Sequence, residues 1–358
     1  MRRILTIVSA FALAMLAQLA PGNAMLTSRD LAVPHYDHIL VIVEENRSYS
    51  TILDHRFAPT IAGLAATYGS AQRMYAERHP SEPNYVALVG GDTFGIADDD
   101  AWYCSPNSTQ PNCKKSNRPG YVRHFIDGPS LATQLRAHGL GWRAYMESIP
   151  APGSLAIFSP ETATQPAQLY ASKHNGFVNF TSVRHDANLA DEFVGFERLR
   201  ADLRSGSVPP FALVVPNQCN DMHGRKASPK TPPDCVDDSA GLVPRGDAVL
   251  RGLVAAIQGS SIWRSGNTAV VVTWDENDDE GRVSGVQGCC VTDAHNPGGG
   301  RIPTLVITNH GPRGLRDWTP YDHYSLLRTI EDAFGLGHLR HAGDPGVRPM
   351  TPLFARPS

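Results

Sequence analysis

The sequence predicts an α/β protein, a three-layer sandwich with a mainly parallel central sheet and helices on both faces. Four runs rich in Val, Ile and Leu are continuously apolar instead of alternating with polar residues. Such runs are typical of strands that are buried on both faces of a parallel sheet. Helical patterns lie in the long stretches between these runs. Alternation of strand and helix along the chain therefore indicates this fold class.

The individual elements follow from these patterns in chain order. The apolar runs predict strands over residues 38–45, 211–216, 268–274 and 302–308. The helical periodicities predict helices over 59–68, 130–138, 246–258 and 321–334, with Asp247 or a neighbour capping the third. The 32 Gly and 28 Pro favour long connecting loops. Loop insertions are expected near residues 98–120, 225–240 and 280–300.

Residues 1–24 have the features of a signal peptide. Arg2 and Arg3 precede an apolar stretch, and small residues up to Ala24 suit cleavage after that position. A membrane anchor is the alternative, but the apolar stretch is short for a spanning helix. We expect residues 25–358 to form one domain without a transmembrane segment, located outside the cell or in the periplasm.

The six cysteines are an even number, which suits disulfides in an exported protein. Local bridges across two turn-rich segments are the simplest pairing: Cys104 with Cys113 and Cys219 with Cys235. Cys289 and Cys290 are adjacent, and a bond between them would close a strained ring. A zinc cluster with His295 is the alternative, but no CxxC spacing supports it.

The charge balance limits the kind of partner. The chain has 32 Lys and Arg against 35 Asp and Glu, a formal net charge of −3. Without a basic surplus, a nucleic acid polymer is not an expected partner. A small anionic substrate would need a local source of positive charge.

Three of the predicted strands end in polar clusters, at residues 44–48, 217–223 and 275–280. Ligands of open α/β sheets bind at the carboxyl ends of the strands. Carboxylate and amide oxygens from separate strand ends predict a site for a divalent cation. The alternative is that these acidic residues are solvated loop residues.

Ser81 stands just before a predicted helix, because Pro83 suits the first turn of a helix. The free N–H groups and the dipole at a helix start favour an anion such as phosphate. They would also make the Ser81 alkoxide easier to form. The alternative is that Ser81 is an ordinary N-cap.

Seven strings follow one another along the chain: EENRSYSTIL, HPSEPNYVALVGG, YASKHNGFVNF, VVPNQCNDMHG, TWDENDDEG, RIPTLVITNHG and DHYSLLRTIEDAFGL. Through these strings, between about residues 37 and 337, the chain resembles the phosphoesterase family, which joins acid phosphatases with phospholipases C within the alkaline phosphatase superfamily. Within that family it resembles the secreted acid phosphatases of the phosphatidylinositol-3-phosphatase kind.

This resemblance implies an alkaline phosphatase-like fold and a site with one divalent metal ion. The matched positions are Glu45 and Asn46 as one ligand pair, Asp275 and Glu276 as the other, Ser81 as nucleophile and ligand, and His174 and His223 as active-site histidines. His323 is a further candidate contact, whereas His79 is interpreted as a loop residue or as a residue that supports a ligand from behind. The oxygen-rich shell favours Mg²⁺, Ca²⁺ or Mn²⁺, and zinc remains an alternative.

The resemblance implies a secreted, metal-dependent acid phosphatase that hydrolyses phosphate monoesters through a phosphoserine intermediate. Its expected partner is a small phosphorylated substrate or a phospholipid head group such as a phosphoinositide. Protonated His174 or His223 is expected to favour activity at acidic pH. A phosphodiesterase of the phospholipase C type is the alternative enzyme, and an inactive exported binding protein is the alternative outside enzymes.

Overall fold

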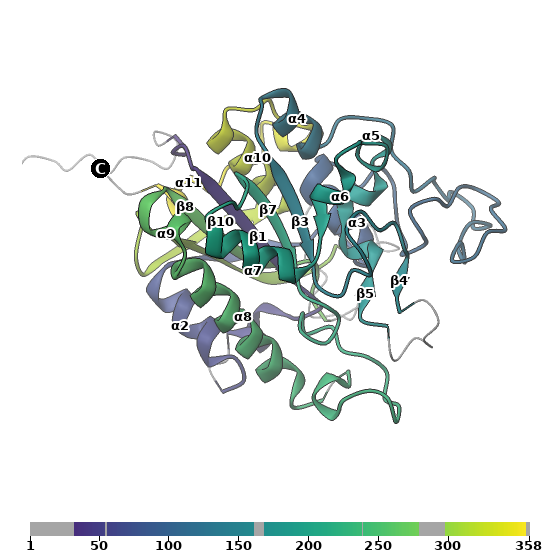
Figure 1. The fold of residues 1–358 in the computed structure, drawn as a ribbon, viewed down its shortest axis with the longest axis horizontal. Helices are drawn as coiled ribbons and strands as arrows, with labels where there is room; N and C mark the ends of the chain where they lie inside the picture. Colours follow the sequence, from purple (N-terminus) through teal and green to yellow (C-terminus); the bar gives the residue numbers. More distant parts are fainter. Residues whose placement is uncertain (1–31, 54–55, 161–167, 238, 279–297, 356–358) are drawn as a thin grey trace, which may run out of the picture.

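The computed structural model describes residues 32–53, 56–160, 168–237, 239–278 and 298–355. The predicted signal peptide, Cys289 and Cys290 lie outside these residues. The described residues form an eight-stranded sheet in the order β10-β2-β9-β8-β1-β7-β3-β6 (Figure 1). Its strands are β1 (His38–Glu44), β2 (Gly69–Tyr75), β3 (Trp142–Met146), β6 (Phe193–Val194), β7 (Phe211–Val215), β8 (Thr268–Trp274), β9 (Arg301–Thr308) and β10 (Leu315–Asp322).

The sheet is mainly parallel, as predicted, but β9 is an exception. It pairs antiparallel with β8 on one side and with β2 on the other. The remaining pairs, β10–β2, β8–β1, β1–β7, β7–β3 and β3–β6, are parallel. The continuous apolar run of β9 showed that the strand is buried, but burial on both faces does not reveal strand direction.

Helices cover both faces of the sheet, which confirms the predicted three-layer architecture (Figure 1). One layer holds α2 (Pro59–Thr67), α7 (Phe196–Ser205), α8 (Leu242–Gln258) and α9 (Ser261–Ser265), which pack against one another. The other layer holds α3 (Glu82–Gly90), α4 (Leu131–Ala137) and α10 (His323–Phe334), with α3 packed against both of its neighbours. The apolar side chains of β1, β7 and β8 are fully buried between the layers.

Asp247 does not cap α8. That helix begins at Leu242, so Asp247 lies inside it and is buried. Its carboxylate accepts hydrogen bonds from the backbone N–H groups of Thr60 (3.2 Å) and Ile61 (2.9 Å), in the first turn of α2. One helix therefore provides the cap for its neighbour. By contrast, α10 is capped by Asp322, which accepts from the backbone N–H of Ser325.

The strands that the sequence did not predict have mixed or short patterns. β2 reads GSAQRMY and β10 reads LRDWTPYD, so neither is a continuous apolar run. β10 is an edge strand with alternating exposure. A separate hairpin of β4 (Phe158–Ser159) and β5 (Tyr170–Ala171) leads directly into the 3-10 turn η2 (Ser172–His174).

The strand register brings the polar segments to one edge of the sheet. Glu44 pairs with Trp274 at the ends of β1 and β8, so Glu45 and Asp275 leave the sheet side by side. The backbone N–H of Asp275 donates to the Glu44 carbonyl at 3.1 Å. β7 flanks β1 on the other side and ends at the same edge. β2 runs in the same direction and leads to Ser81.

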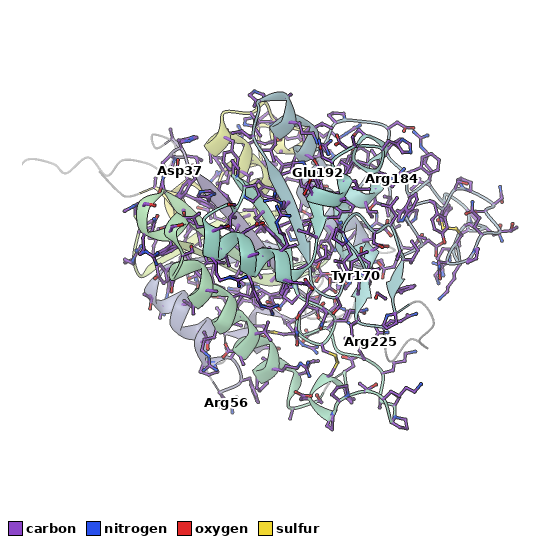
Figure 2. All side chains as sticks on the ribbon, in the orientation of Figure 1. Asp37, Arg56, Tyr170, Arg184, Glu192 and Arg225 are labelled. Atoms are coloured by element: carbon purple, nitrogen blue, oxygen red, sulfur yellow. A yellow bond between two sulfur atoms is a disulfide. The ribbon has the colours of Figure 1, made fainter. Side chains whose placement is uncertain are left out.

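Both predicted local disulfides are present, Cys104–Cys113 and Cys219–Cys235 (Figure 2). Each closes a loop beyond the carboxyl edge of the sheet. Among the described residues, no helix is long and apolar enough to cross a lipid bilayer.

Candidate active site

Ser81 occupies the N-cap position of α3 and is almost completely buried. Its side chain makes no capping hydrogen bond to the helix, so it is not an ordinary N-cap. The Ser81 Oγ instead lies 3.2 Å from Glu45 Oε2 and 3.2 Å from Glu276 Oε1. Lys173 Nζ donates to the same oxygen at 3.2 Å. Ser81 is therefore the point where the polar segments after β1 and β8 meet the lysine of η2.

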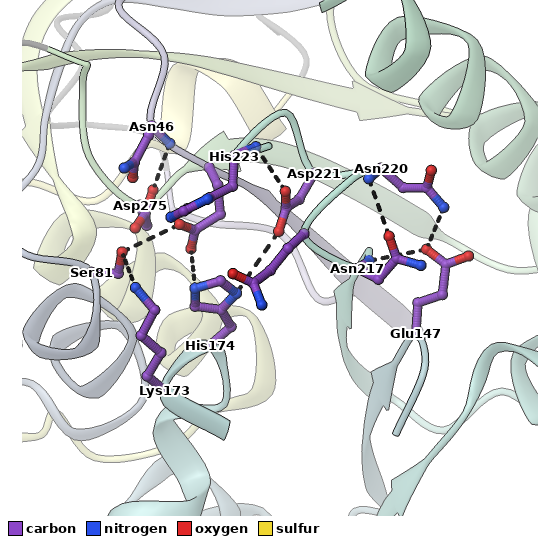
Figure 3. A network of polar contacts seen from close by, with 12 residues as sticks. Asn46, Ser81, Glu147, Lys173, His174, Asn217, Asn220, Asp221, His223 and Asp275 are labelled. Carbon is purple, nitrogen blue, oxygen red and sulfur yellow. Dashed lines mark hydrogen bonds and ion pairs between the residues drawn. The ribbon is translucent and has the colours of Figure 1, made fainter. Parts of the chain in front are cut away.

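The buried carboxylates around Ser81 come from two strand ends (Figure 3). Glu45 follows β1, and Asp275 and Glu276 follow β8, and each is at most 2 % exposed. Burial raises the pKa of all three, and the pKa of Glu276 reaches about 7. Asn46 adopts a positive φ of 40°, and its backbone N–H donates to Asp275 Oδ1 at 3.1 Å. The structure thus brings the three predicted carboxylate ligands close to the predicted nucleophile, and Asn46 joins them through its backbone.

Lys173 was not singled out in the sequence, although it precedes His174 in the same string. It donates to Ser81 and also to Asp99 Oδ2 at 2.8 Å. Burial alone would lower the pKa of Lys173, but the carboxylates of Asp99 and Glu45 raise it, so the amine is charged. A single lysine forms no recognisable sequence motif, so only the fold shows that Lys173 faces Ser81.

His174 lies beside the carboxylates on η2, with its Nε2 3.2 Å from Glu45 Oε1 and its Nδ1 3.8 Å from Asp221 Oδ2. Its ring stacks on Tyr85, with ring centroids 5.4 Å apart. Tyr85 in turn donates from its hydroxyl to Glu45 Oε1 at 2.7 Å. Burial, followed by the charge of Lys173, lowers the pKa of His174 well below its ordinary value.

His223 follows β7 and lies next to His174, with ring centroids 6.1 Å apart. Its Nδ1 lies 2.8 Å from the carbonyl of Gly224, which can only accept, so this nitrogen carries the proton. Burial and the charge of Lys173 lower the pKa of His223 to about 4. Both histidines are therefore neutral near pH 6.5, and the protonated form expected from the sequence is not favoured there.

Hydrogen bonds within the loop after β7 and to Glu147 position His223 (Figure 3). Glu147 Oε2 accepts from the backbone N–H of Asn217 at 3.0 Å and from the side-chain amide of Asn220 at 2.8 Å. Asp221 Oδ1 accepts from the backbone N–H of His223 at 2.8 Å. Asp221 is another buried acid at this edge that the sequence analysis did not select.

His79 lies behind a predicted ligand, which is one of the two roles that the sequence suggested for it. Its Nδ1 lies 2.5 Å from Glu276 Oε2, and its Nε2 lies 3.0 Å from Asn277 Oδ1. Burial alone would lower the pKa of His79, but the contact with Glu276 raises it overall. His79 therefore holds the Glu276 carboxylate from the side opposite Ser81.

His323 does not contact this group of residues directly. It is buried, pairs with Glu77, and has its Nε2 2.9 Å from the carbonyl of Trp274. It therefore joins the ends of β2 and β8 and fixes the residue that precedes Asp275.

The oxygen donors suit a hard divalent cation. Among the described residues, Asn46 Oδ1 and Asp275 Oδ2 are buried and have no hydrogen-bond partner. No three His, Cys, Asp or Glu side chains converge on one point in the described ranges. The predicted ligands nevertheless also include an amide and a hydroxyl. Their three carboxylates outnumber the one ammonium group beside them, that of Lys173. Buried carboxylates in such excess are neutralised by protons or by a compensating cation, and this set of oxygen donors fits a metal ion.

The fold is shared with known protein structures. A structure from Vibrio parahaemolyticus, described as a protein in the alkaline phosphatase superfamily, aligns with a TM-score of 0.52, 14 % identity, and coverage of 88 % of this chain and 72 % of that one. Murine ectonucleotide pyrophosphatase/phosphodiesterase 5 aligns with a TM-score of 0.52, 11 % identity, and coverage of 86 % and 97 %. These similarities confirm the predicted alkaline phosphatase-like fold.

The chain belongs to the Phosphoesterase family, whose model matches residues 51–337. It is 29 % identical to a phosphatidylinositol-3-phosphatase of Mycobacterium tuberculosis, over 93 % of this chain and 89 % of that protein. It is 28 % identical to a probable acid phosphatase of Kluyveromyces lactis, over 87 % of this chain, and spans 62 % of that protein. It spans 48 % of an Aspergillus fumigatus acid phosphatase, at 26 % identity. Family and relatives confirm the predicted enzyme class, a phosphoric monoester hydrolase.

Proposed function

We propose that the protein is a metal-dependent acid phosphatase in which Ser81 attacks the phosphorus of a phosphate monoester. The observation that carries this proposal is the environment of the Ser81 Oγ. It is buried at the start of α3, 3.2 Å from the ammonium of Lys173 and 3.2 Å from each of two carboxylates. An ammonium and the start of a helix both stabilise an alkoxide. A carboxylate oxygen at hydrogen-bond distance can accept its proton.

The metal ion would be held by Glu45, Asn46, Ser81, Asp275 and Glu276. When bound, it lowers the pKa of the serine hydroxyl and stabilises charge on the transferring phosphoryl group. The unpartnered oxygens of Asn46 and Asp275 support this assignment. His79, through Glu276, and Tyr85, through Glu45, orient the outer oxygens of the carboxylates.

His174 and His223 would face the phosphoryl oxygens and the leaving alcohol. Because Nδ1 of His223 donates to Gly224, its Nε2 becomes a donor only when the ring is protonated. A bound phosphate dianion favours that protonation, and the resulting imidazolium can give its proton to the leaving alcohol. Without a bound phosphate, the pKa of His223 is about 4. Proton donation by His223 should therefore speed turnover mainly on the acidic side of neutral.

We also propose that residues 1–24 direct export and that residues 25–358 act outside the cell or in the periplasm as one domain. The two disulfides support this, because such bonds persist in oxidising compartments. The substrate would be a small phosphorylated molecule or a phospholipid head group. The similarity to a phosphatidylinositol-3-phosphatase over 93 % of the chain supports including phosphoinositides.

The decisive measurement compares kcat/KM for p-nitrophenyl phosphate and bis-p-nitrophenyl phosphate between pH 4 and 9, with and without added divalent metals after chelation. We expect the monoester to be preferred, an acidic optimum, and loss of turnover on chelation. A preference for the diester would favour the phospholipase C-type alternative. Attack by Ser81 predicts net retention for a substrate that is chiral at phosphorus, and inversion would show that water attacks directly.

A further inference from the structure

A pocket of about 370 Å³ opens beside the nucleophile. Lys173 and His223 are among the residues that line it, so it is continuous with the candidate active site. Its volume is in the range that holds a small-molecule ligand. The pocket therefore offers room for the part of a substrate that lies beyond the phosphate attacked by Ser81.

The segment that follows the first disulfide supplies two cations to this pocket. Lys114 and Lys115 directly follow the Cys104–Cys113 bridge, and both line the pocket. Asp100 accepts from the backbone N–H groups of Lys114 (2.8 Å) and Lys115 (2.7 Å) and from the Tyr121 hydroxyl (3.2 Å). The Asp100 carboxylate therefore holds the backbone of this segment. The side-chain amines of Lys114 and Lys115 make no hydrogen bond or ion pair to any described residue.

The second disulfide-closed loop supplies two more cations from a different part of the chain. Arg225 and Lys226 lie between Cys219 and Cys235 and also line the pocket. The backbone N–H of Arg225 donates to the carbonyl of Cys235 at 2.7 Å, which ties this segment to the bridge. Arg225 is on the same side of the molecule as Tyr170 of β5 (Figure 2). The guanidinium of Arg225 contacts Gln218, another lining residue.

The pocket lining carries more positive than negative charge, on a chain whose formal net charge is −3. Lys173 is paired with Asp99 at 2.8 Å, and Asp237 lies 3.7 Å from Arg47 outside the lining. Beyond the Lys173–Asp99 pair, the lining cations are Lys114, Lys115, Arg225 and Lys226, against the carboxylates of Asp100 and Asp237.

We propose that this pocket binds a second anionic group, a phosphate carried by the alcohol portion of the substrate. The preferred substrates would then be molecules with two phosphates, one placed at Ser81 and the other among the lysines of the two loops. This inference rests on the proposed phosphatase function and names the substrate class for it. Charge-assisted contacts of this kind are stronger than neutral hydrogen bonds and add specificity.

The first test compares butane-1,4-diol bisphosphate with butane-1,4-diol monophosphate on the full-length protein. We expect kcat/KM for the bisphosphate to be at least about tenfold higher, since one contact to a charged group is worth about that factor. The advantage should shrink as salt is added. Equal values for the two substrates would overturn the second site and leave the phosphatase function standing.

The variants Lys115→Gln and Lys226→Gln should lower the ratio of bisphosphate to monophosphate kcat/KM, by about tenfold when combined. Lys115→Arg should retain the preference, because it keeps the charge. Lys230→Gln is the matched control, because Lys230 is exposed in the second loop but does not line the pocket. A loss that is equal for both substrates, or that Lys230→Gln reproduces, would refute the proposed contacts.

A second arm separates a soluble phosphate from a lipid head group. Dibutanoyl phosphatidylinositol 3-phosphate in solution carries the same two phosphates as the long-chain lipid in phosphatidylcholine vesicles. Turnover of the soluble form that depends on the two lysines supports the pocket. Dependence on the lysines that is seen only with vesicles would overturn it. If neither diol phosphate is hydrolysed, the phosphatase function fails. Calorimetric binding of the bisphosphate to Ser81→Ala, weakened by Lys115→Gln, would still support the pocket, and unchanged binding would reject it.

Discussion

Replacing Lys173 by Gln should slow turnover while leaving the fold intact. The Lys173 ammonium is 3.2 Å from the Ser81 Oγ and 2.8 Å from Asp99 Oδ2, so it joins the nucleophile to a carboxylate at the start of α3. Asp99 also accepts the backbone N–H of Glu82 at 3.1 Å, so the clamp fixes the first residue of the helix. Gln can still donate a hydrogen bond but carries no charge.

The size of the effect follows from the charge that is lost. A buried hydrogen bond to a charged group contributes about 1.5–3 kcal/mol. If all of that is realised when the Ser81 alkoxide forms, kcat falls by about 10- to 150-fold. Lys173→Arg keeps the charge but changes the geometry, so it should lower kcat less than Lys173→Gln does. Asp99→Asn keeps the amine beside Ser81 and should cost less than Lys173→Gln.

The assay is kcat for p-nitrophenyl phosphate, with the thermal midpoint measured by circular dichroism as a check on folding. An unchanged kcat in Lys173→Gln would refute the view that the ammonium stabilises the nucleophile. A midpoint that falls together with kcat would instead show that the lysine serves the packing of α3. If Asp99→Asn lowers kcat as much as Lys173→Gln does, the lysine acts by fixing the start of α3 and not through its charge beside Ser81.

Three further perturbations test separate parts of the structure. Asp275→Asn should reduce bound divalent metal in elemental analysis and abolish most turnover, with an unchanged circular dichroism spectrum; full metal content would contradict its role as a ligand. Asp247→Ala should lower the free energy of unfolding by about 1–2 kcal/mol in urea, because α2 loses its cap, and Asp247→Asn should cost less. Burial lowers the pKa of His124, but Asp98 and Glu82 raise it to about 10 overall, so the folded state holds this proton more tightly than the unfolded state. The unfolding free energy should therefore fall between pH 7 and 10, and His124→Gln should flatten that fall; an identical slope in both proteins would contradict it.

The sequence was most informative where one physical requirement dominates. β1, β7 and β8 are buried on both faces, and their apolar runs predicted them within one residue at each end. The acids that follow β1 and β8 were predicted to meet because parallel strands end at the same edge. The position of Ser81 at a helix start was predicted through Pro83, whose place in the first turn of α3 is confirmed.

The sequence was least informative where a residue depends on a distant partner. Lys173 comes from a 3-10 turn after a short hairpin, and nothing local shows that it faces Ser81 from 92 residues away. Asp247 was interpreted as a local cap, yet its partners lie 186 and 187 residues earlier in the chain. The direction of β9 depends on its pairing with β2 and β8, which a run of apolar side chains does not encode.

The pairing of β1 with β8 also determines when during synthesis the site can form. Asn46 and Asp275 are in contact but 229 residues apart, so the ribosome must add most of the chain before they can meet. Contacts of such long separation form late, because the entropy of closing the intervening loop is lost first. A nascent chain that has not yet produced β8 holds Glu45 and Ser81 but neither Asp275 nor Glu276. If the proposed site is correct, we therefore expect interrupted translation products and amino-terminal fragments to be inactive towards phosphate esters.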